Sequence, residues 1–337
     1  MRVLSLFDGI SGAAQALKEL EIECEYYASE IDKFAIQISQ KNHPDIKHLG
    51  CVKSVNFKDL SFDLPDLLIG GSPCQDLSIA KKGRKGLDGE RSGLFYEYVR
   101  ILKEVKPKFF ILENVASMSK ESKELISKEL FDIEPIMINS SLLVAQQRKR
   151  LYWVGKLVGD KYEQVIIEQP TDQGVLLKDI LESDVDSSYY INTDKGINYL
   201  EKINFKGCKT VDDKSMSLTA SSHKGIGNDG CTLILEPIRV GHFGKGGQGE
   251  RIYSVEGKSI NLSANGGGLG AKTGLYKIDL PDGDYVVRKL TTNECCRLQG
   301  FPDDYVSSVS KTQGYKALGN SFTVPVIKHI ISTIFKN

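Results

Sequence analysis

Asp66-Leu-Leu-Ile-Gly-Gly-Ser-Pro-Cys-Gln75 joins a short apolar run to a proline and a cysteine. The apolar run is typical of a buried strand, and Cys74 follows directly after the end of that strand. In an open α/β sheet, ligands bind at the carboxyl ends of the strands, so a cysteine there meets substrate whereas a cysteine within a strand only packs. The stretch predicts an α/β fold and makes Cys74 a candidate nucleophile.

A second strand of the same design lies further along the chain. Phe109-Phe-Ile-Leu112 is again apolar, and Glu113-Asn-Val115 completes it. Taken singly, a cysteine is usually buried and a glutamate is usually solvated. Two such strands in one sheet would instead place Cys74 and Glu113 at the same edge, where a nucleophile and an acid face one pocket.

The amino terminus adds a third segment of this kind. Val3-Leu-Ser-Leu-Phe7 runs into the glycine turn Asp8-Gly-Ile-Ser-Gly12 and then into a helical pattern, an arrangement that lets the backbone approach a cofactor. The glycine spacing is not that of dinucleotide-binding proteins, which disfavours a ligand with a pyrophosphate. The next predicted strand, Glu25-Tyr-Tyr-Ala-Ser29, ends at Glu30, where an acid can hold ribose hydroxyls.

With these segments in this order, the chain resembles the DNA (cytosine-5) methyltransferases, which use S-adenosylmethionine. Its motifs cover both ends of the chain, and the SPCQ and LENV pair at this spacing is highly specific. They are LFDGISG at 6–12, SEID at 29–32, GGSPCQ at 70–75, LENV at 112–115, QQRKR at 146–150, RKLTTNECCRLQGFPDDY at 288–305 and ALGNSF at 317–322. The resemblance implies a doubly wound, Rossmann-like α/β methyltransferase domain that depends on S-adenosylmethionine, with a smaller, mostly β target-recognition domain.

Changes in composition along the chain suggest where these domains meet. From 168 to 287 the alternation of strands and helices stops, and glycine, serine, asparagine and threonine become dense. We expect 1–167 to form the catalytic and cofactor-binding domain, 168–287 the target-recognition domain, and 288–337 a segment that returns to complete the first. Within the second, 214–220 and 258–264 are similar enough to suggest two related recognition loops.

Overall composition excludes several classes of protein. The 337 residues carry 44 basic and 44 acidic side chains, and no apolar run is long enough to cross a membrane. No signal peptide opens the sequence, so we expect a soluble, cytoplasmic protein. Seven cysteines without a C-x-x-C or Cys/His cluster argue against both a disulfide framework and a metal site.

The resemblance assigns the chemistry to four residues. Cys74 would attack C6 of a cytosine flipped out of duplex DNA, and a protonated Glu113 would meet N3 of the ring. Arg148 and Arg150 would hold the base carbonyl, the carboxylate and a phosphate, although on charge alone they form only the polar start of a strand.

The same resemblance assigns a cofactor site. Phe7 and Ile31 would contact the two faces of the adenine, with Pro73 beside it, and Glu30 would bind the ribose. Asn320 and Ser321 would complete the site from the carboxyl-terminal segment. At Cys51 the family usually has an aspartate that reaches the adenine amino group. The turn around the methionine part comprises Asp8, Gly9, Ile10, Ser11 and Gly12.

Two segments are candidates for binding DNA. The stretch 81–91 is rich in cations and glycine, and is either a solvated loop or a lid that reaches phosphates and closes over the base. The stretch 244–274 resembles the recognition segment of a family member that methylates GCGC, with Gln248 filling the gap left by the base and Arg251 reading a guanine. Asn265 replaces an expected tyrosine, so GCGC and GCNGC both stay open, and 206–236 has no counterpart there. The DNA-binding candidates are Ser78, Lys82, Arg84, Lys85, Arg91, Gln248, Arg251, Ser263 and Asn265.

Three alternative functions remain: an RNA methyltransferase of the tRNA-cytosine type, a DNA-binding protein without activity, and a dinucleotide oxidoreductase. The large glycine-rich domain favours duplex DNA over tRNA, the presence of Cys74 and Glu113 favours activity, and the glycine pattern disfavours a dinucleotide. We expect an enzyme that acts as a monomer and forms 5-methylcytosine in DNA. The sequence does not distinguish a solitary enzyme from one paired with a restriction endonuclease.

Overall fold

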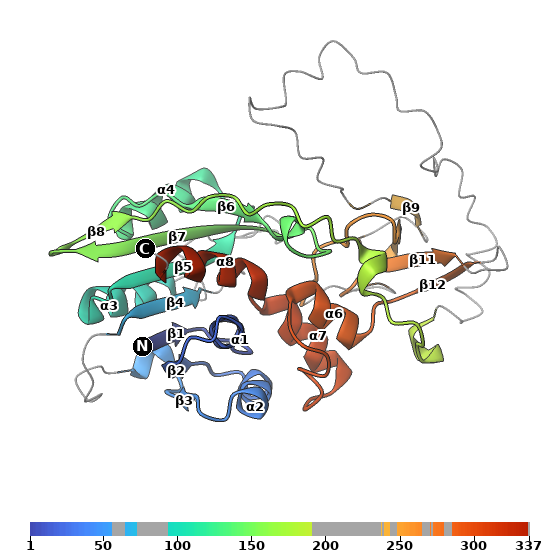
Figure 1. Ribbon diagram of the computed structural model, residues 1–337, viewed down its shortest axis with the longest axis horizontal. Helices are drawn as coiled ribbons and strands as arrows, with labels where there is room; N and C mark the ends of the chain where they lie inside the picture. The colour runs from blue at the N-terminus through green and yellow to red at the C-terminus, as the bar shows by residue number, and fades with distance from the viewer. Residues whose placement is uncertain are drawn as a thin grey trace, which may run out of the picture. The chain divides into compact units, whose positions relative to one another are not determined.

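The computed structural model describes residues 1–55, 65–72, 94–190, 237, 239–242, 248–264, 270, 272–279 and 285–335 (Figure 1). The chain divides into two compact units. Unit 1 comprises Met1–Ser140, Arg148–Pro170 and Thr292–Asn337, and unit 2 comprises Ser141–Gln147 and Thr171–Thr291. Each unit is described separately.

Unit 1 is built on an eight-stranded sheet. The path β3-β2-β1-β4-β5-β7-β6 runs through seven strands, and β8 pairs with β7. The strands from β3 to β5 are parallel, whereas β7 is antiparallel to each of its neighbours. Their bounds are β1 Arg2–Leu6, β2 Glu25–Ser29, β3 Lys47–His48, β4 Leu67–Gly71, β5 Phe109–Val115, β6 Ile136–Asn139, β7 Lys149–Val158 and β8 Lys161–Gln164.

The strand order reverses between β1 and β4, since β2 and β3 extend the sheet in one direction and β5 extends it in the other. Such a switch point leaves a crevice at the carboxyl ends of the two central strands. This confirms the predicted doubly wound α/β fold. It also means that the turn after β1 and the residue after β4 open onto the same crevice.

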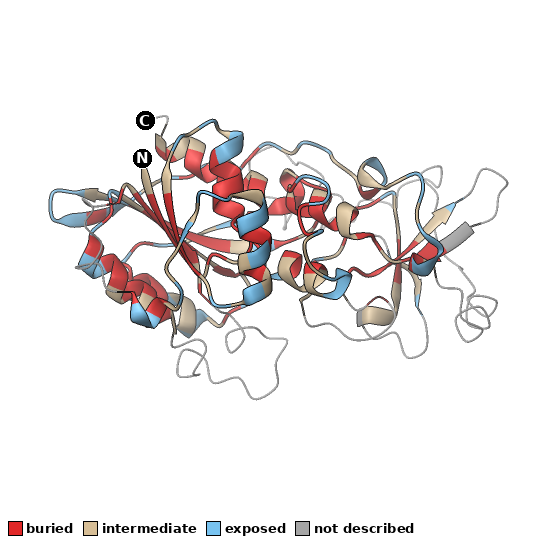
Figure 2. Cartoon of the chain, turned by 90° about the horizontal axis from the view of Figure 1, so that it is seen from below, coloured by how far each residue is buried: buried red, intermediate tan, exposed pale blue. Residues whose placement is uncertain are grey.

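Helices cover both faces of this sheet because side chains alternate along each strand. Leu4, Phe110 and Trp153 belong to a core cluster that includes the buried residues of α3 and Ile126 of α4. Phe109 lies on the opposite face of β5, and its ring centroid is 5.3 Å from that of Phe335 in α8. Helix α8 in turn packs against α1. Figure 2 shows the buried strands between helices that are exposed on their outer sides. The helices are α1 Gly12–Glu19, α2 Lys33–Asn42, α3 Phe95–Val105, α4 Lys120–Glu129, α6 Thr292–Gln299, α7 Lys311–Asn320 and α8 Val324–Phe335, with the 3-10 helix η1 Val52–Ser54.

Unit 2 contains a four-stranded sheet in the order β12-β11-β10-β9. β10 and β11 are parallel, and the outer pairs are antiparallel. Ile252, Leu275 and Tyr276 are buried in it. The second, smaller sheet agrees with the fold class predicted from the sequence. The elements are β9 Arg239–His242, β10 Arg251–Ser254, β11 Leu275–Asp279 and β12 Tyr285–Arg288, with the 3-10 helices η5 Ser140–Leu142, η6 Leu177–Ile180, η7 Ser187–Tyr189 and η9 Gln248–Glu250.

Candidate active site

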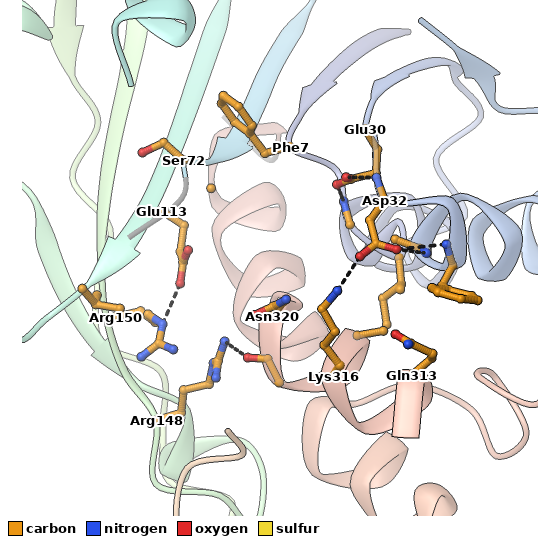
Figure 3. Close-up of a pocket in the computed structure, with 18 residues that line it drawn as sticks. Phe7, Glu30, Asp32, Ser72, Glu113, Arg148, Arg150, Gln313, Lys316 and Asn320 are labelled. Carbon is orange, nitrogen blue, oxygen red and sulfur yellow. Dashed lines mark hydrogen bonds and ion pairs between the residues drawn. The ribbon is translucent and has the colours of Figure 1, made fainter. Parts of the chain in front are cut away.

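A cavity of about 230 Å³ lies in unit 1 at the carboxyl ends of β1, β4 and β5 (Figure 3). One water molecule needs only about 10–15 Å³ of such space, so the cavity is of ligand size. Figure 3 shows Glu113 and Arg150 on one side and Glu30, Asp32 and Lys316 on the other. It is lined by Phe7, Gly9, Ile10, Glu30, Asp32, Phe34, Ala35, Gly71, Ser72, Glu113, Val115, Arg148, Arg150, Gln313, Lys316, Ala317, Gly319 and Asn320.

The turn after β1 is held by a buried carboxylate. The Asp8 side chain is 4% exposed, and it accepts hydrogen bonds from the Ser11 hydroxyl at 2.6 Å and from the Tyr26 hydroxyl at 2.7 Å. Phe7, Gly9 and Ser11 have φ angles of 56°, 61° and 62°, in the left-handed region that costs free energy without glycine. The side chains of Asp8 and Ser11 therefore shape the turn, while Phe7 and Gly9 line the cavity.

Glu30 fixes the opposite wall. One of its carboxylate oxygens accepts from the Gly9 amide at 2.8 Å, and the other accepts from the amides of Ile31 at 2.7 Å and Asp32 at 2.8 Å. Asp32 in turn caps α2 by accepting from the Phe34 amide at 2.9 Å. These bonds hold a carboxylate at the end of β2, as the sequence predicted. Ile31 is 72% exposed and does not line the cavity.

The end of β4 is locked to β5. Gly71 pairs with Glu113, and a Cβ at Gly71 would lie 3.0 Å from Oε2 of Glu113 and 3.1 Å from the Phe322 ring, so a larger residue would disturb the site. Asn114, 1% exposed, donates from Nδ2 to the Ser72 hydroxyl at 3.1 Å. Ser72 follows the end of β4 and immediately precedes Pro73 and Cys74. Its hydrogen bond to Asn114 therefore fixes the position from which the chain continues to the predicted nucleophile.

Glu113 forms an ion pair with Arg150, with Oε1 2.8 Å from Nε. The two side chains are only 13% and 14% exposed. In the antiparallel register, Glu113 faces Tyr152 and Val115 faces Arg150, which makes Glu113 and Arg150 diagonal neighbours on one face of the sheet. Burial, followed by the nearby Glu113 carboxylate, raises the pKa of the Tyr152 hydroxyl, so this neighbour stays uncharged.

Arg148 faces another part of the cavity. Its side chain, 4% exposed, donates from Nη2 to the carbonyl oxygens of Ser321 at 2.9 Å and Gly319 at 3.3 Å. These carbonyls flank Asn320, which lines the cavity. Lys316, one turn earlier on α7, pairs with Asp32 at 2.7 Å. The carboxyl-terminal segment thus forms one wall, as predicted for Asn320.

Apart from Gln248, Arg251 and Ser263, which belong to unit 2, the predicted site residues fall into three groups. Those that line the cavity are Phe7, Gly9, Ile10, Glu30, Glu113, Arg148, Arg150 and Asn320. Those near it that do not line it are Asp8, Ser11, Gly12, Ile31 and Ser321. Those outside the described residues are Pro73, Cys74, Ser78, Lys82, Arg84, Lys85, Arg91 and Asn265. Tyr26, Asp32 and Lys316 also support or line the cavity and were not predicted as site residues, although Asp32, directly before a helical pattern, carried the signal of a cap.

Unit 2 holds the described part of the candidate recognition segment. Arg251, half-buried, begins β10 opposite His242, and the Ser263 amide donates to the Lys272 carbonyl at 3.0 Å. Gln248 begins η9, and its side chain lies outside the described part, as do residues 191–236. Gln146 is fully buried in this unit, where its Oε1 accepts from the Leu262 amide at 3.1 Å. Gln146 therefore supports the segment that contains Ser263.

Two further searches concern only the described residues. No group of three or more His, Cys, Asp and Glu side chains is placed there to hold a metal ion. Within the same ranges, no helix is both long and apolar enough to cross a membrane.

Comparison with solved structures places the fold among known ones. The fold matches a methyltransferase from Entamoeba histolytica, EhMeth, with a TM-score of 0.69 and 18% identity over 100% of this chain and 98% of that chain. It also matches the Dnmt2 methyltransferase of S. pombe, with a TM-score of 0.65 and 20% identity over 100% and 98% of the two chains. The doubly wound domain therefore has the fold of these two methyltransferases.

Sequence comparison gives the family. The profile of the C-5 cytosine-specific DNA methylases matches residues 1–336. Type II methyltransferase M.HhaI from Haemophilus parahaemolyticus is 30% identical, over 99% of this chain and 94% of its own length. Type II methyltransferase M.HpaII from Haemophilus parainfluenzae is 29% identical, over 96% and 86%. The chain belongs to the C-5 cytosine-specific DNA methylase family and is a DNA (cytosine-5) methyltransferase.

Proposed function

We propose that this enzyme transfers a methyl group from S-adenosylmethionine to C5 of a cytosine flipped out of duplex DNA, through a covalent bond between Cys74 Sγ and C6. The observation that carries the proposal is the cavity, whose wall contains the Glu113–Arg150 ion pair and Ser72, two residues before Cys74. Bisulfite sequencing of DNA from a methylase-free host that expresses the protein tests it. Unmethylated DNA with methylated tRNA would point to an RNA substrate instead.

The residues of the cavity fit the cofactor. Glu30 offers carboxylate oxygens suited to ribose hydroxyls, and Phe7 offers an aromatic face for a purine. A carbon added at Gly9 would meet no atom within 4 Å, so this turn leaves open space beside its backbone. We assign Ile31 and Pro73 to the adenine, the Asp8–Gly12 turn to the methionine part, and Asn320 with Ser321 to the remaining wall. When bound, S-adenosylmethionine supplies an electrophilic methyl group.

The chain's own residues then perform the remaining steps. C5 of cytosine is a weak nucleophile, and addition of the Cys74 thiolate to C6 moves electron density onto C5 and N3. Glu113, which is ion-paired with Arg150 before the base binds, takes up a proton and meets N3 in its acid form, so negative charge does not build up on the ring. Arg150 holds Glu113 in place, and we assign its guanidinium group to the base carbonyl. After C5 has been methylated, N3 returns its proton to Glu113, the C5 proton passes to solvent and the Cys74 thiolate leaves, which restores the aromatic ring.

Unit 2 is proposed to read the DNA. We assign catalysis to 1–167 with 288–337 and target recognition to 168–287, with Ser78, Lys82, Arg84, Lys85 and Arg91 on the DNA backbone and Gln248, Arg251, Ser263 and Asn265 at the site. The resemblance of residues 244–274 to the recognition segment of a family member that methylates GCGC supports a G+C site, GCGC or GCNGC, in duplex DNA. The enzyme would act as a monomer in the cytoplasm of a bacterial or phage-infected cell.

Glu30→Ala is expected to weaken S-adenosylmethionine binding by about 1.5 to 3 kcal/mol, the scale of a lost charge-assisted hydrogen bond. The change removes both the proposed ribose contact and the bond to the Gly9 amide. Isothermal titration calorimetry measures the affinity. Glu19→Ala, which removes a carboxylate paired with Lys328 at 3.3 Å, is the control. Unchanged affinity in Glu30→Ala would reject this cofactor site.

Arg251→Ala is expected to cost about 1 to 3 kcal/mol of discrimination at one guanine and to relax specificity there, because arginine suits the guanine O6 and N7 edge. Neutralising Lys82 or Lys85 should instead weaken binding to every sequence and flatten its salt dependence. Binding to a set of single-base variants of the mapped site separates the effects. An even loss of affinity across that set in Arg251→Ala would contradict the assignment.

A further inference from the structure

We propose that Arg148 is a positioning residue for the cofactor site, which fixes the end of α7 so that Asn320 faces the cavity. This differs from a direct contact with the base or a phosphate. The inference rests on the proposed function only in naming S-adenosylmethionine as the ligand of that cavity, because the contacts of Arg148 stand by themselves.

The end of a helix leaves carbonyl groups without partners inside the helix. α7 ends at Asn320, and Arg148 donates to the carbonyl oxygens on both sides of that residue, Gly319 at 3.3 Å and Ser321 at 2.9 Å. A cation at the carboxyl terminus of a helix is also favoured by the helix dipole. Arg148 thus caps α7 although it lies 171 residues before Gly319 in the sequence.

The burial of Arg148 explains why these bonds matter. Its side chain is 4% exposed, and a guanidinium group buried that deeply needs acceptors for its N–H groups. The backbone of Arg148 is itself fixed, because its amide donates to Oδ1 of Asn139 at 3.1 Å. A rigid donor therefore meets the last turn of α7.

The end of α7 has further polar support on its other side. Gln299, fully buried, donates to the Leu318 carbonyl at 2.8 Å and accepts from the Thr323 hydroxyl at 2.8 Å. Arg148 and Gln299 together hold the carbonyls of three residues around Asn320. Losing the arginine would release two of them while the rest of the packing remains, so the expected effect is local.

Arg150 provides a contrast within the same segment. It lies two residues further along and pairs with Glu113 at 2.8 Å. The two arginines thus contact different walls of the cavity (Figure 3). Arg150 contacts the Glu113 carboxylate, and Arg148 contacts the segment that carries Asn320. Removing Arg148 should affect the cofactor before it affects the base.

The test compares Arg148→Ala and Arg148→Lys with Lys149→Ala, an exposed neighbouring cation, as the control. Calorimetry should show S-adenosylmethionine affinity at least tenfold weaker in Arg148→Ala, partly restored in Arg148→Lys, and unchanged in Lys149→Ala. Affinity for duplex DNA without cofactor should stay within twofold in all three. Asn320→Ala combined with Arg148→Lys should lose less than the product of the two single effects, because Arg148 acts through Asn320.

A second measurement does not depend on the cofactor. Amide hydrogen exchange near residues 318–323 should rise at least tenfold in Arg148→Lys, and this variant also serves if Arg148→Ala fails to fold. Weaker DNA binding with unchanged cofactor affinity and exchange would overturn the inference and return Arg148 to a base or phosphate contact. If the wild type failed to bind S-adenosylmethionine, the proposed function would fall, whereas the exchange result would still decide the role of Arg148.

Discussion

Replacing Cys74 by serine is expected to reduce methyl transfer to below a few per cent of the wild-type rate while leaving S-adenosylmethionine affinity nearly unchanged. The reason is chemical, because a serine hydroxyl is a far weaker nucleophile than a thiolate near neutral pH. Transfer of a labelled methyl group to duplex DNA measures the rate, and calorimetry measures the affinity.

Cys24→Ser is the matched control. This half-buried thiol lies directly before β2, at the opposite end of the strand from Glu30, and burial raises its pKa, so it should contribute nothing to the rate. Trapping on a duplex that contains 5-fluorocytosine gives an independent readout, since only a covalent mechanism leaves a stable adduct. An adduct that persists in Cys74→Ser, or a retained rate, would show that another nucleophile acts.

The parts of the site that sequence predicted are those with local signals. An apolar run followed by a turn or an acid marks the ends of β1, β2, β4 and β5, and each of these ends reaches the same side of the sheet because parallel strands point in one direction. Phe7, Glu30 and Glu113 line one cavity for that reason. Periodicity and the rule for ligand binding in α/β sheets were enough to predict Glu30 and Glu113 at this edge, whereas Phe7 was assigned through the family resemblance.

Residues whose role depends on a distant partner could not be predicted in this way. Tyr26 lies within a strand, and only the fold brings its hydroxyl to Asp8. Asp32 and Lys316 are 284 residues apart in the sequence and meet because α7 packs near the start of α2. Such contacts have no periodicity, so they leave no trace in a single sequence.

The run Gln146–Arg150 shows the same limit at shorter range. On charge alone the run is the polar start of a strand, yet Gln146 is buried in unit 2 and Arg148 is buried in unit 1. The Ser259 amide donates to the Ala145 carbonyl at 2.7 Å, and the Gln147 amide donates to the Ser259 carbonyl at 2.9 Å. Composition gave no sign that residues 141–147 join the second unit, because these ladder bonds use only the backbone.

Glu113→Gln is expected to slow methyl transfer by about 10²–10⁴-fold, the usual contribution of a positioned acid or base. Glutamine has almost the same size, so it keeps the shape of the wall beside Gly71, but it has no acidic proton for N3 and no charge for Arg150. Single-turnover methyl transfer under saturating cofactor measures the chemical step. Cofactor affinity should change little, because Glu113 lies on the side of the cavity away from Glu30 (Figure 3).

Glu97→Gln separates the chemistry of Glu113 from the simple loss of an ion pair. Glu97 pairs with Arg100 on α3 at 2.8 Å, the same distance that joins Glu113 to Arg150, and its pair does not line the cavity. Its removal should leave the rate unchanged. Loss of the Glu113 carboxyl group should also slow adduct formation on the 5-fluorocytosine duplex, and loss of the Glu97 carboxylate should not. The reason is that addition of the thiolate needs charge compensation at N3. A rate in Glu113→Gln within tenfold of the wild type, with normal adduct formation, would mean that the carboxylate only holds Arg150 and that the acid is another group.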